Sequence, residues 1–537
     1  MKPTNAQLKR TTLRLRSSRS IACLGAVAAL FNASCIATEE AAIEGVEERL
    51  GERQDALYGN GNYWSTGADG VTEIPVCWTF SGYDSDKEYV RSAVEGHWGA
   101  VASVRFTGWG TCGGSTPSNA IRINQSDETP HSNVGTTGSG VSMTLNFTYD
   151  NWNSYTYVDC ECPPYDAACV FHSASYYKYN CDYCSGNHEF CDGLIALHEF
   201  GHALGFYHEQ DRPDNAGGEY CDDTVSTDYG GDDLTSGYDT GSIMNYCTEW
   251  DHTVPEISDG DVEGVIAAYG TRPYTLTNQA LIYEDTGFSR SVQALYPGDY
   301  NMSDLTIGND TVSSLRIPSG WTVQLFADAS FSGSSVTLTS DASDLSDVSF
   351  NDRASSIRVI GTSTAFPVIY KDAGYSGTSL TLRPGVYSSS GDLGGVGNDA
   401  VTSMTVPSGW TVTLYENANF GGSSVTYTSN ISNLGSFNDK ATSIKVVGPT
   451  GTNPVVIYKD ASYVGAGQAL WPGRYEAADL SIGSDELTSL TIPTGWTVLL
   501  MEHSPFWGNL KQYTSSQSSV SGFNDATSSI VVFGPDP

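Results

Sequence analysis

The second half of the chain repeats one short phrase, and this repetition constrains the fold more than any other feature. In each copy an Asp follows Asn (Ser in one copy), and a Ser or Thr stands three residues after the Asp, followed by Ser. The copies begin 42, 47, 40, 46 and 40 residues apart, so shorter and longer spacings alternate. This alternation indicates that the copies come in pairs, which predicts six motifs in three domains. The Asp and hydroxyl residues are Asp310 and Ser313, Asp352 and Ser355, Asp399 and Thr402, Asp439 and Thr442, Asp485 and Thr488, and Asp525 and Ser528.

A second phrase precedes most copies. It consists of an aromatic residue, another aromatic five positions later, and Gly two positions after that, as in Tyr370, Tyr375 and Gly377. Two copies depart from it. Arg290 stands where the Gly is expected, and Met501 replaces the first aromatic, which we expect to weaken that hairpin.

Together the two phrases resemble βγ-crystallin domains. The resemblance implies all-β Greek-key sandwiches at residues 274–361, 366–448 and 454–537, with calcium held between paired motifs. Ca²⁺ prefers six to eight hard oxygen ligands, which Asp carboxylates, hydroxyls and turn carbonyls supply. The six Asp and six hydroxyl residues above are therefore the expected ligands of up to six Ca²⁺. One alternative is that Asn-Asp only shapes turns. A β-trefoil lectin is the alternative fold, although it would show three repeats of ~40 residues.

A different motif, at residues 198–209, carries the chemistry. His198 and His202 are four positions apart, so on a helix they lie on one face and can bind one metal ion. Glu199 lies beside the first ligand, where it can take a proton from the attacking water. Gly205 can adopt the left-handed conformation that ends a helix, so that the chain turns back and brings His208 as a third ligand. Three protein ligands are typical of a catalytic zinc site, whereas structural sites have four.

This string resembles the metzincin peptidases, and within them the astacin family. Glu209, directly after the third His, is an astacin feature, and Ser242-Ile-Met244-Asn-Tyr246 matches the family's Met-turn. The resemblance implies an α+β zinc-protease domain at residues 56–272. It also implies that Met244 lies beneath the metal and that Tyr246 is a switchable fifth zinc ligand that stabilises the transition state. Asn245 replaces a His whose side chain has no assigned role. Residues 141–147 alternate like the edge strand that holds peptide substrates in this family.

The first residues are typical of an export signal. A basic stretch is followed by the short apolar run Ile21–Phe31 and by small residues, so we expect a secretory signal peptide at residues 1–35. Lipid modification of Cys35 is an alternative that would anchor the protein. The Glu-rich residues 36–55 are expected to be a propeptide or linker. No later segment is apolar for the ~20 residues that a transmembrane helix needs.

Cysteine usage and charge agree with export. The ten cysteines after the signal all lie between Cys77 and Cys247, and their even number predicts up to five disulfides in one domain. A zinc knuckle formed by Cys160, Cys162, Cys181 and Cys184 is the alternative. The formal net charge of −36 argues against a nucleic-acid partner, because phosphate binding requires a basic surface.

The sequence thus predicts a secreted zinc endopeptidase with one catalytic Zn²⁺ that acts on proteins or peptides. Its three calcium-binding domains would add stability or target the enzyme to a matrix, glycan or cell surface. The resemblance also implies a zymogen that is cut near Asp55 and Ala56, so that the new amino terminus pairs with Glu209. The alternative function is a non-catalytic, calcium-dependent surface-binding protein.

Overall fold

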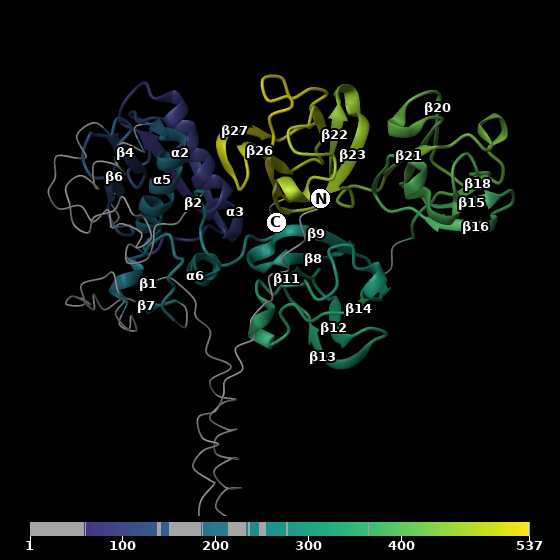
Figure 1. The fold of residues 1–537 in the computed structure, drawn as a ribbon, viewed down its shortest axis with the longest axis horizontal. Coiled ribbons are helices and arrows are strands. Elements are labelled where there is room, and N and C mark those ends of the chain that lie inside the picture. Colours follow the sequence, from purple (N-terminus) through teal and green to yellow (C-terminus); the bar gives the residue numbers. More distant parts are fainter. Residues whose placement is uncertain are drawn as a thin grey trace, which may run out of the picture. The chain divides into compact units, whose positions relative to one another are not determined.

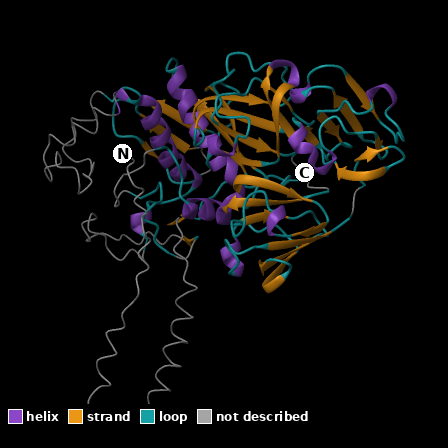
Figure 2. Cartoon of the chain, turned by 45° about the vertical axis from the view of Figure 1, so that its right-hand side comes forward, coloured by secondary structure: helices purple, strands orange, loops and turns teal. Residues whose placement is uncertain are grey.

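The computed structural model describes residues 58–59, 61–136, 141–149, 184, 186–212, 232–234, 237–245, 254–274, 278–362 and 365–535 (Figure 1). The predicted signal peptide and propeptide, Tyr246 and six of the ten later cysteines lie outside these residues. Helices are found between residues 84 and 269, whereas residues 280–533 form strands joined by loops and short 3₁₀ turns (Figure 2).

The amino-terminal region contains a five-stranded sheet with the strand order β3-β2-β4-β6-β5. Its strands are β2 (Thr72–Trp78), β3 (Val104–Thr111), β4 (Ile121–Gln125), β5 (His131–Ser132) and β6 (Val141–Leu145). The first four in this order are parallel, and β5 pairs antiparallel with β6. A separate pair joins β1 (Tyr58–Gly59) to β7 (Asp232–Asp233).

The prediction that residues 141–147 form the edge strand is wrong. The short strand β5 pairs with Met143 and Thr144 and is itself the edge of the sheet. Met143, Thr144 and Leu145 are all buried, as expected of an inner strand, so the alternation of residue types did not distinguish an inner strand from an edge strand.

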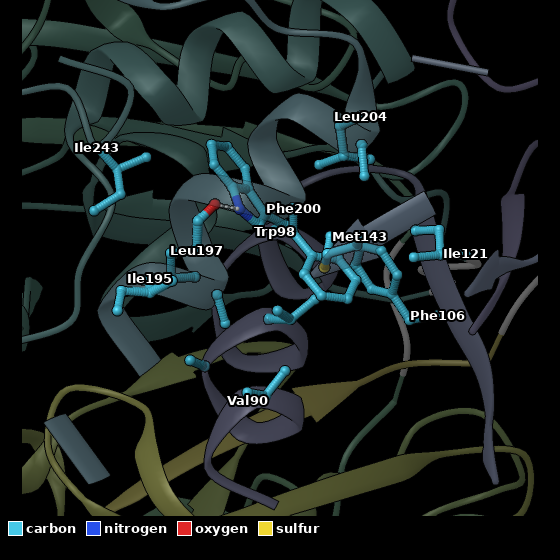
Figure 3. Packing of buried hydrophobic residues seen from close by; sticks show 14 of the residues in the cluster. Val90, Trp98, Phe106, Ile121, Met143, Ile195, Leu197, Phe200, Leu204 and Ile243 are labelled. Carbon is cyan, nitrogen blue, oxygen red and sulfur yellow. Dashed lines mark hydrogen bonds between the residues drawn. The ribbon is translucent and has the colours of Figure 1, made fainter. Parts of the chain in front are cut away.

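In the described part of the chain, four helices accompany this sheet: α2 (Asp84–Gly96), α3 (Trp98–Val101), α5 (His188–Leu204) and α6 (Asp259–Tyr269). Trp98 is fully buried, and its indole Nε1 donates a hydrogen bond to the Leu197 carbonyl at 2.9 Å. Phe200 of α5 packs edge-on against Phe106 of β3, with ring centroids 5.4 Å apart (Figure 3). This apolar packing fixes α5 against the sheet, so the helix presents its polar residues in a defined direction.

Two disulfides lie in the described part of this region, Cys77–Cys112 and Cys184–Cys191. The second uses one of the four cysteines of the alternative zinc knuckle. Cys184 therefore does not act as a thiolate ligand there, since a disulfide sulfur carries no thiolate charge.

The carboxy-terminal region is built from three similar sets of strands. The first set is β8 (Ala280–Asp285), β9 (Ser289–Leu295), β10 (Gly298–Tyr300), β11 (Ser314–Arg316), β12 (Thr322–Asp328), β13 (Ser332–Leu338) and β14 (Ser356–Ile360). The second is β15 (Val368–Asp372), β16 (Ser376–Thr381), β17 (Gly385–Tyr387), β18 (Ser403–Thr405), β19 (Thr411–Tyr415), β20 (Ser424–Tyr427) and β21 (Ser443–Val447). The third is β22 (Val455–Asp460), β23 (Val464–Leu470), β24 (Gly473–Tyr475), β25 (Ser489–Thr491), β26 (Thr497–His503), β27 (Trp507–Tyr513) and β28 (Ser529–Phe533).

Each set has the crossed strand order of a Greek key. In the second set, β16-β15-β18 form one sheet and β17-β21-β19-β20 form the other. The third strand of the first motif, β17, thus pairs with β21, the last strand of the second motif. In the other two sets, β10 pairs with β14 and β24 pairs with β28 in the same way. This exchange ties two motifs into one sandwich, as the predicted pairing of motifs requires.

Apolar cores lie inside these sandwiches. The first cluster contains buried residues between Ala280 and Val359, and the second contains those between Ile369 and Val446. The third contains buried residues between Val455 and Val532, together with Leu281, Tyr283 and Phe288 of the first set. The first and third sets share a seven-stranded sheet in which β9 lies next to β24.

The two departures from the hairpin phrase have different structural consequences. Gly333 has φ 77°, and a Cβ there would lie 2.6 Å from the carboxylate of Asp328. Arg290 occupies the corresponding position with φ 61°, and its Nε lies 3.5 Å from the corresponding Asp285. Met501 is fully buried in a cluster with Leu499, Phe506, Leu510, Val531 and Phe533. It therefore fills apolar space in place of the aromatic ring.

Candidate active site

Helix α5 carries the first two predicted zinc ligands and Glu199. The helix ends at Gly205, which has φ 107° and whose N–H donates to the His202 carbonyl at 2.8 Å. The next N–H, of Phe206, donates to the Gly201 carbonyl at 3.1 Å. Together the two hydrogen bonds form a Schellman motif, in which a glycine in the left-handed conformation ends the helix. The chain then turns back, and this turn brings His208 to the face of the helix that carries the other two histidines.

The three imidazoles form one cluster. One ligand atom from each of His198, His202 and His208 lies within 4.8 Å of the others. Nε2 of His202 is 3.0 Å from Nε2 of His208. Two nitrogens bound to one zinc ion at ~2.0–2.1 Å and a tetrahedral angle would be about 3.3 Å apart. The observed separation therefore fits a shared metal ion.

Backbone carbonyls fix the tautomers of two of these rings. Nδ1 of His198 lies 2.7 Å from the carbonyl oxygen of Ile243, and Nδ1 of His202 lies 2.7 Å from that of Phe206. A carbonyl oxygen can only accept, so each Nδ1 carries the proton and each Nε2 keeps a lone pair for a metal. On the third ring, Nδ1 of His208 faces the carboxylate of Asp211 at 3.6 Å.

Burial keeps His198 and His202 in the neutral form that metal binding needs. It lowers the pKa of His202 to about 3, with a further contribution from His208. The pKa of His198 is also lowered far below its ordinary value, mainly by burial and then by the other two rings. Neutral imidazoles suit zinc well, so the residues present fit the ion that the sequence predicts.

Glu199 is the buried acid of the cluster. Its side chain is 3 % exposed, and burial raises the pKa of its carboxyl to about 8. Within the part of the chain that the structure describes, its Oε2 atom has no hydrogen-bond partner. A carboxylate that is poorly solvated and carries an unsatisfied oxygen is well suited to accept a proton.

Met244 lies against Gly201 in the last turn of α5 and is fully buried. A Cβ on Gly201 would come within 2.3 Å of the Met244 sulfur, so this helix position must be glycine for the turn to approach as closely as it does. The backbone N–H of Glu209 also donates to the Met244 carbonyl at 2.9 Å. Met244 thus lies between the metal-binding helix and the segment that carries His208.

Asp261 is a site residue that the sequence reasoning missed. It is fully buried, and its carboxylate accepts hydrogen bonds from the Ser242 hydroxyl at 2.6 Å and the Ile243 N–H at 2.8 Å. Asp261 also forms a capping box with Ser258 at the start of α6. The pattern Ser258-x-x-Asp261 was visible in the sequence as a helix start, but its link to the turn at Met244 was not.

Asn245 has more contacts than the sequence suggested. Its side chain is 2 % exposed and bonds to the Tyr238 hydroxyl at 2.9 Å and the Asp239 carbonyl at 3.0 Å. It thus helps to hold the turn. The next residue, Tyr246, is the predicted fifth ligand and lies outside the described residues.

Glu209 is fully buried and charge-paired. Its Oε1 accepts the Asp239 N–H at 2.9 Å, and Nε of the equally buried Arg212 lies 3.4 Å away. Near the start of the described chain, Gly59 forms a bridge with Phe206, three residues before Glu209. The structure therefore pairs the beginning of this region with the segment that leads into Glu209.

The predicted calcium residues meet in reciprocal pairs. In each sandwich, the hydroxyl of one motif donates to the Asp of the other motif. The distances are 3.1 Å for Ser313–Asp352, 2.8 Å for Ser355–Asp310, 3.0 Å for Thr402–Asp439, 3.1 Å for Thr442–Asp399, 3.3 Å for Thr488–Asp525 and 2.9 Å for Ser528–Asp485. All six Asp residues have φ between 49° and 57°, so a shared turn conformation aims their carboxylates across the pair.

The Asn of the phrase supports its neighbouring Asp. In five copies the Asn side-chain amide lies 2.6–3.3 Å from the second oxygen of the following Asp. In the remaining copy, Ser484 instead bonds to the Ser528 hydroxyl at 3.0 Å. The carboxylate of Asp485 therefore lacks the amide contact that orients the other five.

Comparison with known proteins identifies both regions. A family model described as Beta/Gamma crystallin matches residues 322–406 and 411–492, and one described as Astacin, a peptidase family, matches residues 187–254. The crystallin limits start in the middle of the sandwiches. All six motifs resemble one another, so the family model, which spans two motifs, can align with the second motif of one sandwich and the first motif of the next.

Relatives match the carboxy-terminal region. Development-specific protein S of Myxococcus xanthus is 29 % identical over 181 residues, which cover 32 % of this chain and 99 % of that protein. A Beta/gamma-crystallin of Ciona intestinalis is 39 % identical over 80 residues, which cover 15 % of this chain and 90 % of that protein. A solved betagamma-crystallin domain from Clostridium beijerinckii is 45 % identical, covers 15 % of this chain and 97 % of its own, and has a TM-score of 0.15. The Ciona relative shows that the chain belongs to the βγ-crystallin family through its carboxy-terminal domains, whereas residues 187–254 are similar to the astacin peptidase family.

Proposed function

We propose that this protein is a zinc-dependent endopeptidase of the astacin type, with an α+β catalytic domain. The observation that carries the proposal is the cluster of His198, His202 and His208 next to Glu199. Two of the rings have tautomers set for metal binding, and the acid beside them is buried with an unsatisfied oxygen. Histidines that lay together on a helix by chance would have no reason to hydrogen-bond through Nδ1 to carbonyls outside the helix, as His198 and His202 do with Ile243 and Phe206.

A zinc ion held by the three histidines would supply Lewis-acid polarisation of the peptide carbonyl and a more acidic water. Glu199 accepts the proton of the attacking water and delivers it to the leaving amine, a role that its raised pKa favours. Tyr246 donates a hydrogen bond to the developing oxyanion, a role assigned from the family resemblance. Met244 and Asp261 hold the turn that fixes the His198 ring.

The carboxy-terminal domains are proposed to bind calcium. The paired Asp and hydroxyl groups supply hard oxygens on both sides of each motif pair, which is the chemistry that Ca²⁺ prefers. Up to six ions fit the six pairs. Bound calcium would stabilise the sandwiches and neutralise part of the −36 charge, and these domains would carry the enzyme to a matrix, glycan or cell surface.

We place the protein outside the cell, with lipid anchoring at Cys35 as the alternative to free secretion. The amino-terminal pattern of residues 1–35 supports export, and the two disulfides suit an oxidising compartment. Among the described residues, none of the helices has the length and apolar character to cross a membrane. Localisation of a fusion protein with and without Cys35→Ser would separate the two forms.

The proposed activity is tested by cleavage profiling of the purified mature protein on a peptide library, with and without 1,10-phenanthroline. Cleavage that the chelator abolishes and Zn²⁺ restores is the expected result. Calcium-dependent binding to surfaces with no cleavage of any peptide would favour the non-catalytic alternative. Glu73→Ala, a change at an exposed acid on strand β2, is a suitable control and should leave cleavage unchanged.

A further inference from the structure

A second cluster of metal-binding groups lies at the amino-terminal end of α5, away from the three histidines. Its members are Asp86 from the first turn of α2, and His188 and Asp192 from the start of α5. One ligand atom from each lies within 4.8 Å of the others. Nδ1 of His188 is 3.3 Å from the Asp86 carboxylate, and the Tyr149 hydroxyl donates to Oδ1 of Asp192 at 2.6 Å.

In the described part of the chain, Asp86 faces His188, whereas no basic side chain forms an ion pair with the buried Asp192. Asp192 is 2 % exposed, and its Oδ2 has no hydrogen-bond donor in the described part of the chain. Its nearest acidic neighbour, Asp86, is also a carboxyl group and could share a bond only by carrying a proton. The amine of the adjacent Lys87 is occupied with the Phe80 carbonyl at 3.2 Å. Burial, with a contribution from Asp86, raises the pKa of Asp192 to about 9.

Two neighbouring carboxylates with a buried unsatisfied oxygen call for a proton or a cation between them. A proton would neutralise one charge, and His188 would then contact only Asp86 of the two carboxyl groups. A divalent cation would satisfy both carboxylates and the ring together. His188 and Asp192 are four residues apart on one helix, the same spacing that lets His198 and His202 share an ion.

We propose that Asp86, His188 and Asp192 form a second metal site that takes a divalent transition-metal cation such as Zn²⁺. The donor set decides the class of ion. An imidazole nitrogen suits zinc and its neighbours, whereas Ca²⁺ and Mg²⁺ prefer oxygen ligands alone. We expect a structural role despite only three protein ligands, because Asp192 is 2 % exposed and the ligands join two helices; a water molecule would complete the coordination.

The position of the site explains what the ion would do. It joins the first turn of α2 to the first turns of α5, and the Cys184–Cys191 disulfide holds the chain just before that point. The other half of α5 carries two of the proposed catalytic ligands. A cation here would therefore fasten the amino-terminal end of this helix to α2, in addition to the disulfide.

The test measures zinc bound per full-length mature chain in a His202→Ala background, with Ca²⁺ present in excess to fill oxygen-rich sites. This background removes the first centre, so the outcome does not depend on the proposed peptidase activity. We expect the His202→Ala chain to retain one Zn²⁺. Adding Asp192→Asn should lower its zinc affinity at least ~10–100-fold.

His188→Gln serves as a second variant, because this side chain is 35 % exposed and its replacement puts the fold at less risk. Asp84→Asn, at an exposed acid in the same turn of α2, is the matched control and should keep the zinc. A His202→Ala chain that binds no zinc would overturn the proposal. So would equal zinc affinity with and without Asp192→Asn and His188→Gln, or retention of Ca²⁺ alone at this site.

Discussion

Nδ1 of His198 donates to the carbonyl oxygen of Ile243 at 2.7 Å, although the two residues are 45 positions apart in the chain. The N–H of the same Ile243 donates to Asp261 at 2.8 Å. The first of the proposed zinc ligands is thus oriented by a turn that a buried carboxylate on a third segment holds in place. Outer contacts of this kind commonly tune metal sites as strongly as the direct ligands do.

We predict that Asp261→Ala lowers peptidase activity ~10–100-fold with a smaller loss of zinc, because the Ile243 carbonyl loses its support. Activity and zinc content of the purified variant are the measurements. Asp259→Ala, two positions earlier on α6, is the matched control, since Asp259 does not contact this turn in the described structure. Full activity in the Asp261 variant would contradict the prediction, because it would show that the turn keeps its conformation without the Asp261 carboxylate.

The family resemblance predicts maturation by a cut near Asp55 and Ala56. Because Gly59 bridges to Phe206, an amino terminus three or four residues before Gly59 can reach the Glu209 segment. Amino-terminal sequencing of the active form should begin within one or two residues of Ala56. A start well before residue 50 would contradict this prediction.

Calcium should raise the melting temperature of the carboxy-terminal domains. An ion that binds only the folded form stabilises it by about 2.7 kcal/mol when its concentration is a hundred times Kd. The site at Asp485 should be the weakest, since Ser484 does not orient that carboxylate. We expect Ser484→Asn to strengthen binding there, measured by calcium titration, and Asp399→Asn to remove one of the two sites of the second sandwich. If calcium shifts none of the transitions, the phrase only forms turns.

The Asp192 carboxyl predicts a specific pH dependence in metal-free protein. Its pKa in the fold is raised to about 9 from an ordinary 3.8, mainly by burial. The folded state therefore holds a proton that the unfolded state releases, so this group's stabilising effect is complete below pH 3.8 and is lost as the pH rises toward 9. In EDTA, the stability of Asp192→Asn relative to the native protein should rise between about pH 5 and about pH 8.5. Urea unfolding at both values checks this, and a constant difference would contradict it.

The sequence predicted the parts of the site whose chemistry lies in side chains at fixed spacing. His198 and His202 could be placed on one helix face, and the alternating motif spacings predicted the paired sandwiches that the strand exchange of β10, β17 and β24 shows. The partners of the imidazoles could not be predicted, because the carbonyls of Ile243 and Phe206 are backbone atoms that every residue has.

Two other features depended on tertiary context. The two-residue strand β5 is too short to leave a pattern, so the edge of the sheet was assigned to the wrong strand. Asp86 and Asp192 are 106 positions apart in an acidic chain, and only the fold brings their carboxylates together. In both cases the feature depends on which distant segments meet in the fold, and the local pattern of residues does not predict that.

The central claim is that Glu199 moves the proton in a zinc-dependent hydrolysis. The most direct measurement compares turnover and zinc content in the native enzyme, Glu199→Ala and His202→Ala. We predict that Glu199→Ala keeps its zinc and its fold but loses ~10²–10⁴-fold or more in turnover, since it lacks only the general base. His202→Ala should lose the catalytic zinc together with the activity. A Glu199→Ala protein that cleaves peptides at the native rate would contradict the account.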